Sequence, residues 1–307
     1  MPFPAEVAKP SNDIPPGSEM NDKLKALLSD LNKVVTSLTS DDDDEDELEV
    51  QFQSNSCSYL NCDEFNSIVS KTPTNFSAFH LNIASMSKHF GKLGNLLAKL
   101  NCNFSFIGIS ETRSLVDNDS VPLEQKKHFP IPGYEKFYTP TESSAGGVSL
   151  YVSKTLSFKP RDDLKQAFYL AHNLEAVFVE IIQTKKPNMI VGTIYRHPCM
   201  PINLFNSDYL KPLLHKISSE KKQILLLGDF NIDLLKCDDE PEVASFMDIL
   251  GSNLILPQIL LPTRITDVSK TLIDNIFSSP CDSGTISGNF CRAISDHLNF
   301  AFFRHLI

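Results

Sequence analysis

The sequence predicts an α/β protein whose β-sheets are largely buried. From about residue 75 onward, short apolar runs rich in β-branched and aromatic side chains alternate with longer segments in which apolar residues recur at helical spacing. Apolar residues make up 41% of the chain, which is enough for a sizeable core. Because buried strands are continuously apolar and helices must cover their faces, this pattern favours helices layered on sheets.

The N-terminal residues 1–55 are expected to form an extension outside the folded body. Residues 1–19 are rich in Pro, Ser and charged side chains, which predicts disorder. Residues 21–39 place leucines and valines at spacings of three, four and seven, which predicts one amphipathic helix. The acidic run 41–47 (DDDDEDE) repels itself and is interpreted as a solvated linker.

A domain is expected over residues 76–307, after a short lead-in segment of residues 56–75. Its apolar runs are predicted strands, namely 76–81, 104–109, 146–152, 176–182, 189–194, 223–228, 271–277 and 297–303. The predicted helices between them are 88–100, 202–219 and 241–253. The first helix keeps four apolar side chains, from Phe90 to Leu100, on one face.

The acidic excess lies almost entirely outside this domain. The chain has a net charge of −10, and residues 1–75 hold 5 Lys and Arg against 15 Asp and Glu. The remaining residues hold 23 of each kind, so the body is neutral. A neutral body is compatible with a nucleic-acid partner and a basic groove on one face, but it does not require either.

The seven cysteines include no Cys-x-x-Cys pair and no His cluster at zinc spacing. We interpret them as reduced, mostly buried thiols of an intracellular protein. No apolar stretch approaches the roughly 18 residues of a transmembrane helix, so no membrane partner is expected. The N-terminus lacks a basic start followed by an apolar run, so no secretory signal is expected either.

Polar side chains follow four predicted strands at the point where each ends. Asn82, Glu111 and Tyr195 follow three of them, and residues 229–231 (Asp-Phe-Asn) follow the fourth. Ligand sites form at such places because buried sheets hold the strand ends rigid while the loops expose them. Each residue alone has a structural explanation, such as a turn-forming Asn or a phenol at the core edge. Together they predict a site.

Five motifs, in this order, resemble those of the endonuclease/exonuclease/phosphatase superfamily. They are residues 80–83 (His-Leu-Asn-Ile), 109–112 (Ile-Ser-Glu-Thr), 228–231 (Gly-Asp-Phe-Asn), 271–277 (Thr-Leu-Ile-Asp-Asn-Ile-Phe) and 295–297 (Ser-Asp-His). The segments GGVSLYVS, GTIYRHP and LPTRIT further resemble LINE-type retrotransposon endonucleases of the chicken-repeat-like group. The resemblance covers about residues 76–303. It implies a four-layer sandwich of two packed mixed β-sheets flanked by helices.

The resemblance implies a Mg²⁺ site, in which Mn²⁺ can substitute. Its ligands would be Glu111, Asn82 and Asp296, a lean set of oxygen donors of the kind that Mg²⁺ accepts. Ala84 departs from some superfamily members, which have Asp at that place, so the site would depend more on Glu111.

The resemblance also implies a set of catalytic residues. Asp229 would orient or deprotonate the attacking water, and Asn231 would hold that water or the phosphate. His297 would donate to the phosphate as negative charge builds, and Asp274 would fix the tautomer of His297. Tyr195 would give a further hydrogen bond to the scissile phosphate.

Four weaker candidates for phosphate contacts lie beside the motifs. They are Arg113, Arg196, Thr263 and Arg264. Surface solvation explains each arginine equally well. Residues 146–147 (Gly-Gly) are interpreted as a turn into the next strand rather than as a backbone approach to DNA.

The resemblance implies an intracellular, nuclear endonuclease that nicks DNA to leave a 3′ hydroxyl for target-primed reverse transcription. In full-length elements a reverse transcriptase domain follows, and its Tyr-x-Asp-Asp core is absent from this sequence. Two alternatives remain. One is another hydrolase of the same fold, either an abasic-site repair nuclease or an inositol or lipid phosphatase. The other is a non-catalytic, co-opted transposon remnant that binds DNA or protein.

Overall fold

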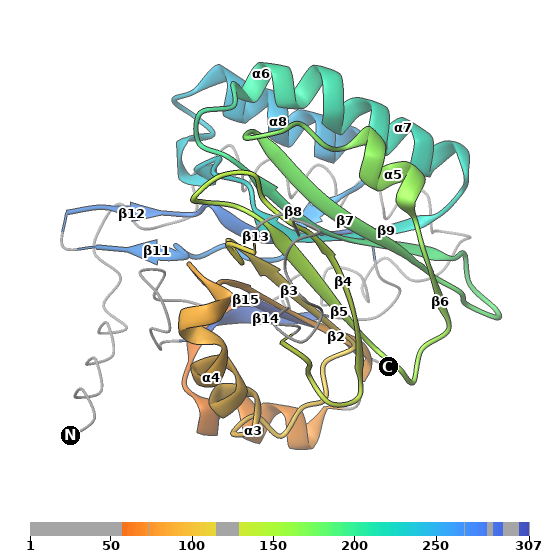
Figure 1. The fold of residues 1–307 in the computed structure, drawn as a ribbon, viewed down its shortest axis with the longest axis vertical. Coiled ribbons are helices and arrows are strands. Elements are labelled where there is room, and N and C mark those ends of the chain that lie inside the picture. The colour runs from red at the N-terminus through yellow and green to blue at the C-terminus, as the bar shows by residue number, and fades with distance from the viewer. Residues whose placement is uncertain are drawn as a thin grey trace, which may run out of the picture.

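The structure, a computed structural model, describes residues 57–72, 74–114, 129–266, 268–280, 285–290 and 301–306. They form two mixed β-sheets packed face to face, with helices on the outer face of each sheet (Figure 1). This confirms the predicted four-layer α/β sandwich. The predicted helix 21–39 and the rest of the extension 1–55 lie outside the described residues.

The first sheet has seven strands in the order β1-β14-β15-β2-β3-β5-β4. Their bounds are β1 Cys57–Leu60, β2 Thr74–Asn82, β3 Phe106–Ser110, β4 Tyr134–Thr139, β5 Val148–Ser153, β14 Thr285–Phe290 and β15 Ala301–Leu306. Strands β2 and β3 are parallel neighbours, and Asn82 lies opposite Ser110 in their register. Both strands therefore end at the same edge. Helices α3 (Cys62–Lys71) and α4 (Met86–Leu97) cover the outer face of this sheet (Figure 1).

The second sheet has six strands in the order β10-β13-β9-β8-β7-β6. Their bounds are β6 Phe158–Pro160, β7 Leu174–Ile181, β8 Met189–Arg196, β9 Gln223–Asp229, β10 Leu256–Pro257 and β13 Asp274–Ser278. Strands β8 and β9 are parallel, with Tyr195 opposite Asp229. Strand β13 runs antiparallel to β9 and places Asp274 opposite the same Asp229.

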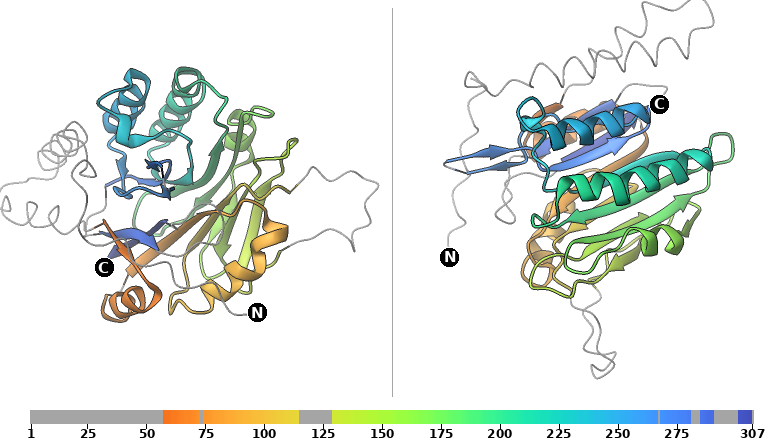
Figure 2. Two further views of the ribbon diagram at one scale, coloured as in Figure 1. Left: turned by 90° about the vertical axis from the view of Figure 1, so that its left-hand side faces the viewer. Right: turned by 90° about the horizontal axis from the view of Figure 1, so that it is seen from above.

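Helices α5 (Asp162–Ala167) and α8 (Pro241–Ser252) cover the outer face of the second sheet together with one continuous helix between them (Figures 1 and 2). That helix consists of α6 (Ile202–Leu204), the π-helical turn η2 (Phe205–Leu210) and α7 (Lys211–Ser219), which confirms the prediction for 202–219. A short 3-10 turn, η3 (Leu234–Lys236), precedes α8. The hairpin of β11 (Arg264–Ile265) and β12 (Lys270–Thr271) projects beyond the sheets (Figure 1).

The expected lead-in segment, 56–75, contributes to the fold, which corrects the boundary at residue 76. Strand β1 pairs in parallel with β14, and Phe65 of α3 is fully buried against other phenylalanine rings. An Asn61–Glu64 capping box begins α3, because each side chain accepts from the other residue's backbone N–H. Strand β1 was not predicted, because it has only four residues and they do not alternate between buried and exposed positions.

The inner faces of the two sheets approach closely at Gly108 of β3. A Cβ atom at this position would lie 2.9 Å from Thr193 Oγ1 and 3.1 Å from Leu227 Cβ. Both of these residues belong to the second sheet and are fully buried. The absence of a side chain at Gly108 therefore lets the sheets pack at this separation.

Two findings bear on the expected environment of the protein. The helices in the described part of the chain are too short, or not apolar enough, to cross a membrane. Five of the seven cysteines lie in that part and none is in a disulfide, as expected for reduced thiols. Of these five only Cys237 is fully buried and Cys199 is exposed, so the expectation of mostly buried thiols was wrong for them.

Candidate functional site

The structure brings five of the candidate residues to one end of the sandwich. Asn82 ends β2 and Glu111 directly follows β3, on the first sheet. Tyr195 lies near the end of β8, Asp229 ends β9 and Asp274 begins β13, on the second sheet. These positions coincide because β2 and β3, and likewise β8 and β9, are parallel neighbours.

Asn82 connects the two sheets through its side-chain amide. Its Nδ2 donates to Glu111 Oε1 at 2.9 Å and to Asp229 Oδ2 at 2.8 Å. Its Oδ1 accepts from the backbone N–H of Ala84 at 3.0 Å, which fixes the orientation of the amide. Asn82 and Asp229 are each only 1% exposed. The amide therefore holds two carboxylates from different sheets beside each other.

The loops that carry Asn82 and Glu111 are joined by backbone hydrogen bonds. The bonds run from Ile83 N to Ser110 O, from Ser85 N to Glu111 O and from Met86 N to Thr112 O. Four non-glycine residues of these loops have positive φ angles, namely Ala84 (48°), Ser85 (125°), Glu111 (49°) and Arg113 (51°). Such conformations cost free energy and persist only where the surroundings enforce them, often at functional sites.

The glycine pair at 146–147 supports the second of these loops. The backbone N–H groups of Thr112 and Arg113 donate to Gly147 O and Gly146 O at 3.1 and 2.9 Å. Gly146 has φ 102°, and a Cβ atom there would lie 2.8 Å from both Glu175 Oε1 and His197 Nε2. The pair leads directly into β5, and its two carbonyls hold the loop after β3.

Glu111 accepts hydrogen bonds from three side chains. Asn82 and Tyr195 donate to Oε1, the latter from its hydroxyl at 3.4 Å. Arg113 Nη2 donates to Oε2 at 2.9 Å. Burial raises the pKa of Tyr195, and the charges of Glu111, Asp229 and Glu175 raise it further, so the phenol stays protonated and acts as a donor.

The loop after β9 is held by Arg196, one of the weak candidates for a phosphate contact. Arg196 is 2% exposed. Its Nε and Nη2 donate to the carbonyls of Phe230 and Asn231 at 2.5 and 2.6 Å, and its Nη1 donates to Met200 O. Burial lowers the pKa of Arg196 to about 10, so the side chain remains a cation at neutral pH. A buried guanidinium that donates to three loop carbonyls supports the backbone rather than a ligand.

Asn231 lies at the turn of the same loop, with φ 48°. Its backbone N–H donates to Asp229 Oδ1 at 3.0 Å, and its side-chain Nδ2 donates to Arg196 O at 2.7 Å. Both carboxylate oxygens of Asp229 thus accept a hydrogen bond from a residue of the site. These contacts orient the Asp229 carboxylate toward the edge shared by the two sheets.

Thr263 and Arg264, both weak phosphate candidates, differ in their surroundings. Thr263 is fully buried, and its Oγ1 accepts from the backbone N–H groups of Ile273 and Asp274 at 3.3 and 3.1 Å. The hydroxyl therefore fixes the start of β13 and with it the position of Asp274. Arg264 is exposed on the β11–β12 hairpin, and Arg113 is 38% exposed. These two arginines remain accessible to a ligand.

His80 was not among the functional residues predicted from the sequence. His80 is 1% exposed, its Nδ1 lies 3.8 Å from Asp274 Oδ1, and its Nε2 lies 3.3 Å from Ser110 Oγ. It thereby links the first sheet to Asp274 on the second. Alternation could have indicated it, because His80 precedes Asn82 by two residues on one strand and shares its face.

A buried pair of Glu175 and His197, also missed, lies behind Tyr195. His197 Nε2 is 2.8 Å from Glu175 Oε2, and both residues are less than a tenth exposed. The rings of Tyr195 and His197 lie edge to face with centroids 4.7 Å apart. Glu175 lies opposite Tyr195 in the β7–β8 register. No local signal identifies this pair, because only the strand register brings the two residues together.

The remaining candidates, Asp296 and His297, lie outside the described residues. Within the described part of the chain, no group of three or more His, Cys, Asp and Glu side chains is placed to hold a metal ion. Glu111 and Asp229, joined through Asn82, are nevertheless a fitting donor set for Mg²⁺. This ion binds through one or two carboxylates together with substrate phosphate and retained waters.

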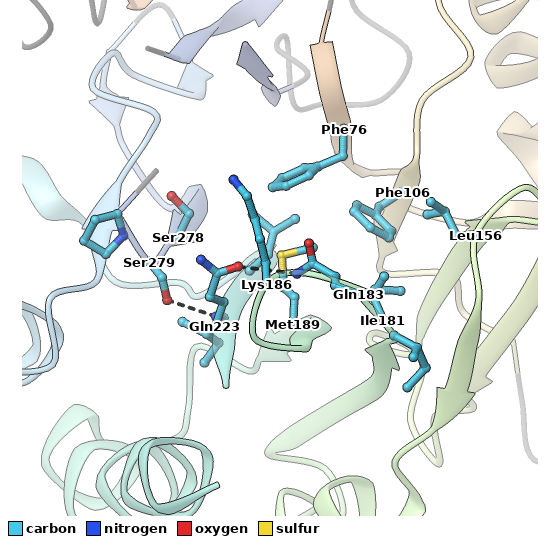
Figure 3. Close-up of a pocket in the computed structure, with 14 residues that line it drawn as sticks. Phe76, Phe106, Leu156, Ile181, Gln183, Lys186, Met189, Gln223, Ser278 and Ser279 are labelled. Carbon is cyan, nitrogen blue, oxygen red and sulfur yellow. Dashed lines mark hydrogen bonds between the residues drawn. The ribbon is translucent and has the colours of Figure 1, made fainter. Parts of the chain in front are cut away.

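A separate cavity of about 230 Å³ lies at the opposite end of the sandwich (Figure 3). Its lining includes the first residues of β3, β8 and β9, namely Phe106, Met189 and Gln223, and the last residue of β13, Ser278. The candidate site occupies the other ends of these same strands.

The comparisons with known proteins identify the fold. No protein-family model matches the sequence. No curated protein matches it. Solved structures do match, among them the endonuclease domain of TRAS1, a telomere-specific non-LTR retrotransposon, with 16% identity over 76% of this chain and 99% of that chain and a TM-score of 0.54. The AP endonuclease LMAP from Leishmania major has 12% identity over 90% and 99% of the two chains and a TM-score of 0.58.

A third match is the catalytic domain of APE2 from Xenopus laevis, with 13% identity over 75% of this chain and 91% of that chain and a TM-score of 0.51. At such identities the likeness establishes the fold. The chain therefore shares the α/β sandwich fold of the TRAS1, LMAP and APE2 domains.

Proposed function

We propose that this protein is a divalent-metal-dependent DNA endonuclease that cuts one strand and leaves a 3′ hydroxyl. The observation that carries the proposal is the Asn82 bridge, which places the Glu111 and Asp229 carboxylates together at the shared edge of the sheets. The fold supports it, since TRAS1 and LMAP, which share this fold, are named as endonucleases.

In this proposal Glu111 is the main metal ligand, with Asn82 beside it and Asp296 as a further ligand. The bound Mg²⁺, or Mn²⁺ in its place, would polarise the phosphate and stabilise the leaving 3′ oxygen. Asp229 orients the attacking water and accepts its proton, and Asn231 positions that water or the phosphate. Two hydrogen bonds hold the Asp229 carboxylate in place for this role.

The remaining groups stabilise the charge that develops on the phosphate. Tyr195 stays protonated because its pKa is raised, so its hydroxyl donates a hydrogen bond. His297 donates to the same phosphate, and Asp274 fixes the tautomer of His297. Arg113 and Arg264, which are accessible to a ligand, contact the flanking phosphates. In a retrotransposon the released 3′ hydroxyl would prime reverse transcription, and the protein would act in the nucleus.

Nicking of supercoiled plasmid by the full chain tests this function. Conversion to the open-circular form should require Mg²⁺ or Mn²⁺ and stop in EDTA, and a polymerase should extend the product from its 3′ hydroxyl. Glu111→Gln should lower the nicking rate by roughly a thousandfold or more, because the amide is a poor ligand for the metal. Glu135→Gln is a matched control, because Glu135 is exposed on β4 and pairs with Val152, remote from the site.

The two alternatives predict different results. A fully active Glu111→Gln variant, or nicking in EDTA, would refute the metal-dependent mechanism. Release of phosphate from an inositol or lipid phosphate without plasmid nicking would support a phosphatase of the same fold. DNA binding without nicking, in either metal, would support a non-catalytic remnant.

A further inference from the structure

Arg113 places a positive charge against the carboxylate that we assign to the metal. Its Nη2 donates to Glu111 Oε2 at 2.9 Å, and it is the more exposed partner, at 38% against 14%. The other oxygen, Oε1, accepts from Asn82 and Tyr195. Oε2 is therefore the oxygen of Glu111 that accepts from Arg113, the more exposed partner of the pair.

The backbone keeps Arg113 at this position while leaving its side chain able to move. Arg113 and Glu111 both have left-handed φ angles, 51° and 49°, on either side of the buried Thr112. The backbone N–H of Arg113 donates to Gly146 O at 2.9 Å, which anchors the residue independently of its guanidinium. A partly exposed side chain on an anchored backbone can exchange one partner for another by rotation about its own bonds.

We propose that Arg113 couples metal binding to DNA binding by exchanging Glu111 for a DNA phosphate. Without metal, Arg113 is the counter-ion of Glu111. When DNA binds, a phosphate draws the guanidinium away and leaves Glu111 Oε2 open to the divalent cation. This inference rests on the proposed function.

Two physical arguments support the exchange. A guanidinium a few Å from Glu111 Oε2 repels a divalent cation at the same carboxylate, so each weakens the binding of the other. A phosphate is an alternative partner that matches the planar guanidinium with two parallel hydrogen bonds. Because coupling between binding sites is reciprocal, DNA should raise the affinity for metal by the factor by which metal raises the affinity for DNA.

The first test is Mn²⁺ binding to the full chain without DNA, measured by electron paramagnetic resonance of the free ion at fixed ionic strength. Arg113→Gln should bind Mn²⁺ about tenfold more tightly than wild type, within the usual range of such couplings. Arg113→Lys should stay close to wild type, because the ammonium keeps the charge. Lys154→Gln is the control for net charge, because Lys154 is exposed and follows the far end of β5.

The second test repeats the titration with a saturating phosphorothioate duplex that resists cleavage. The Mn²⁺ affinity of both proteins should rise, because substrate phosphate is itself a ligand of the ion, and the gain of wild type should exceed that of Arg113→Gln by about tenfold. Wild-type or weaker Mn²⁺ binding by Arg113→Gln without DNA would overturn the proposal, as would an equal gain with DNA in both proteins. Equal Mn²⁺ binding by wild type and Glu111→Gln would instead refute the proposed metal ligand. As a control for folding, each variant should unfold at the same midpoint temperature as wild type.

Discussion

Asn82 donates from a single nitrogen to Glu111 and to Asp229, and these two carboxylates belong to different sheets. In this arrangement the amide both neutralises part of the repulsion between the carboxylates and sets their separation. A buried polar group that satisfies two charged acceptors is costly to remove, because both acceptors lose a charge-assisted hydrogen bond.

Asn82→Ala should therefore lower the nicking rate by about a hundredfold or more, since removal of one positioned donor at an active site typically costs that much. The fold should persist, because the substitution leaves no side chain larger than the space available. Asn101→Ala, in the exposed loop after α4, is the matched control and should keep wild-type activity. Plasmid nicking together with circular dichroism measures both effects. Wild-type nicking by Asn82→Ala would show that the bridge has no catalytic role.

The proposed pairing of Asp274 with His297 can distinguish an enzyme from a DNA-binding remnant. His297→Ala should abolish nicking and leave DNA affinity nearly unchanged, because most phosphate contacts come from other residues. Asp274→Asn should lower the nicking rate less than His297→Ala does, by about a hundredfold or more, since the imidazole remains but loses its orienting charge. Nicking and fluorescence anisotropy on the same proteins test this. Should both variants nick plasmid as wild type does, these two residues have no catalytic role.

Gly146→Ala should damage the site as well as the fold. The added methyl group would lie 2.8 Å from Glu175 Oε1 and His197 Nε2, at a backbone φ of 102°. Relief of this contact must move either the pair behind Tyr195 or the carbonyl that anchors Arg113. Gly133→Ala is a matched control, because Gly133 has φ 84° but no atom within 4 Å of the added Cβ.

The strained backbone should lower the free energy of unfolding of both variants by about 1–2 kcal/mol. Gly146→Ala should lose more than this, because its methyl group also meets Glu175 and His197. Only Gly146→Ala should also lose nicking activity. Urea denaturation and plasmid nicking measure the two losses. Equal stability and equal activity of the two variants would contradict the packing argument.

The pH dependence of stability should depend on Glu180, at the far side of the second sheet. Burial alone would raise the pKa of this carboxyl, but hydrogen bonds from Lys222 and Asn188 outweigh it and lower the pKa to about 2 from the model-peptide value of 4.5. Since the folded-state pKa is depressed, the stabilisation is present above about pH 4.5 and is lost as the pH falls toward 2.

This shift corresponds to a contribution of Glu180 to the free energy of unfolding on the order of 3 kcal/mol at neutral pH. In Glu180→Gln the free energy of unfolding should therefore fall less steeply with acidification than in wild type. Glu135→Gln, on the exposed edge strand β4, should keep the wild-type slope. Urea titrations at several pH values below neutral provide the measurement. Identical slopes in wild type and Glu180→Gln would remove Glu180 as a source of acid sensitivity.

The sequence could predict the residues whose role depends on strand ends. Asn82, Glu111, Tyr195 and Asp229 were found because each follows an apolar run, and parallel strands bring such ends together. Periodicity predicted buried strands covered by helices, and the resemblance of the motifs implied their arrangement in four layers.

The sequence could not distinguish an accessible side chain from a buried one beside the same motif. Arg196 looks like a surface arginine in GTIYRHP, but its guanidinium donates to the carbonyl of Phe230, 34 positions later. Thr263 similarly supports Asp274 across a turn. The Glu175–His197 pair depends on the register of β7 and β8, which no local pattern specifies.

The contacts between the carboxylates of the site depend on the distance between the two sheets, which is short at Gly108. Glu111 lies three residues beyond Gly108 on one sheet, and Asp229 lies two residues beyond Leu227 on the other. The 2.8 Å contact from Asn82 to Asp229 is lost if the sheets part by about 1 Å. A single methyl group at Gly108, with no polar atom involved, would press on Thr193 and Leu227 and force such a movement. Filling space in a core is a common route to greater stability. At Gly108 there is no such space to fill, and an added methyl group would part the two carboxylates, so the lack of a side chain there is as necessary to the chemistry as the polar groups themselves.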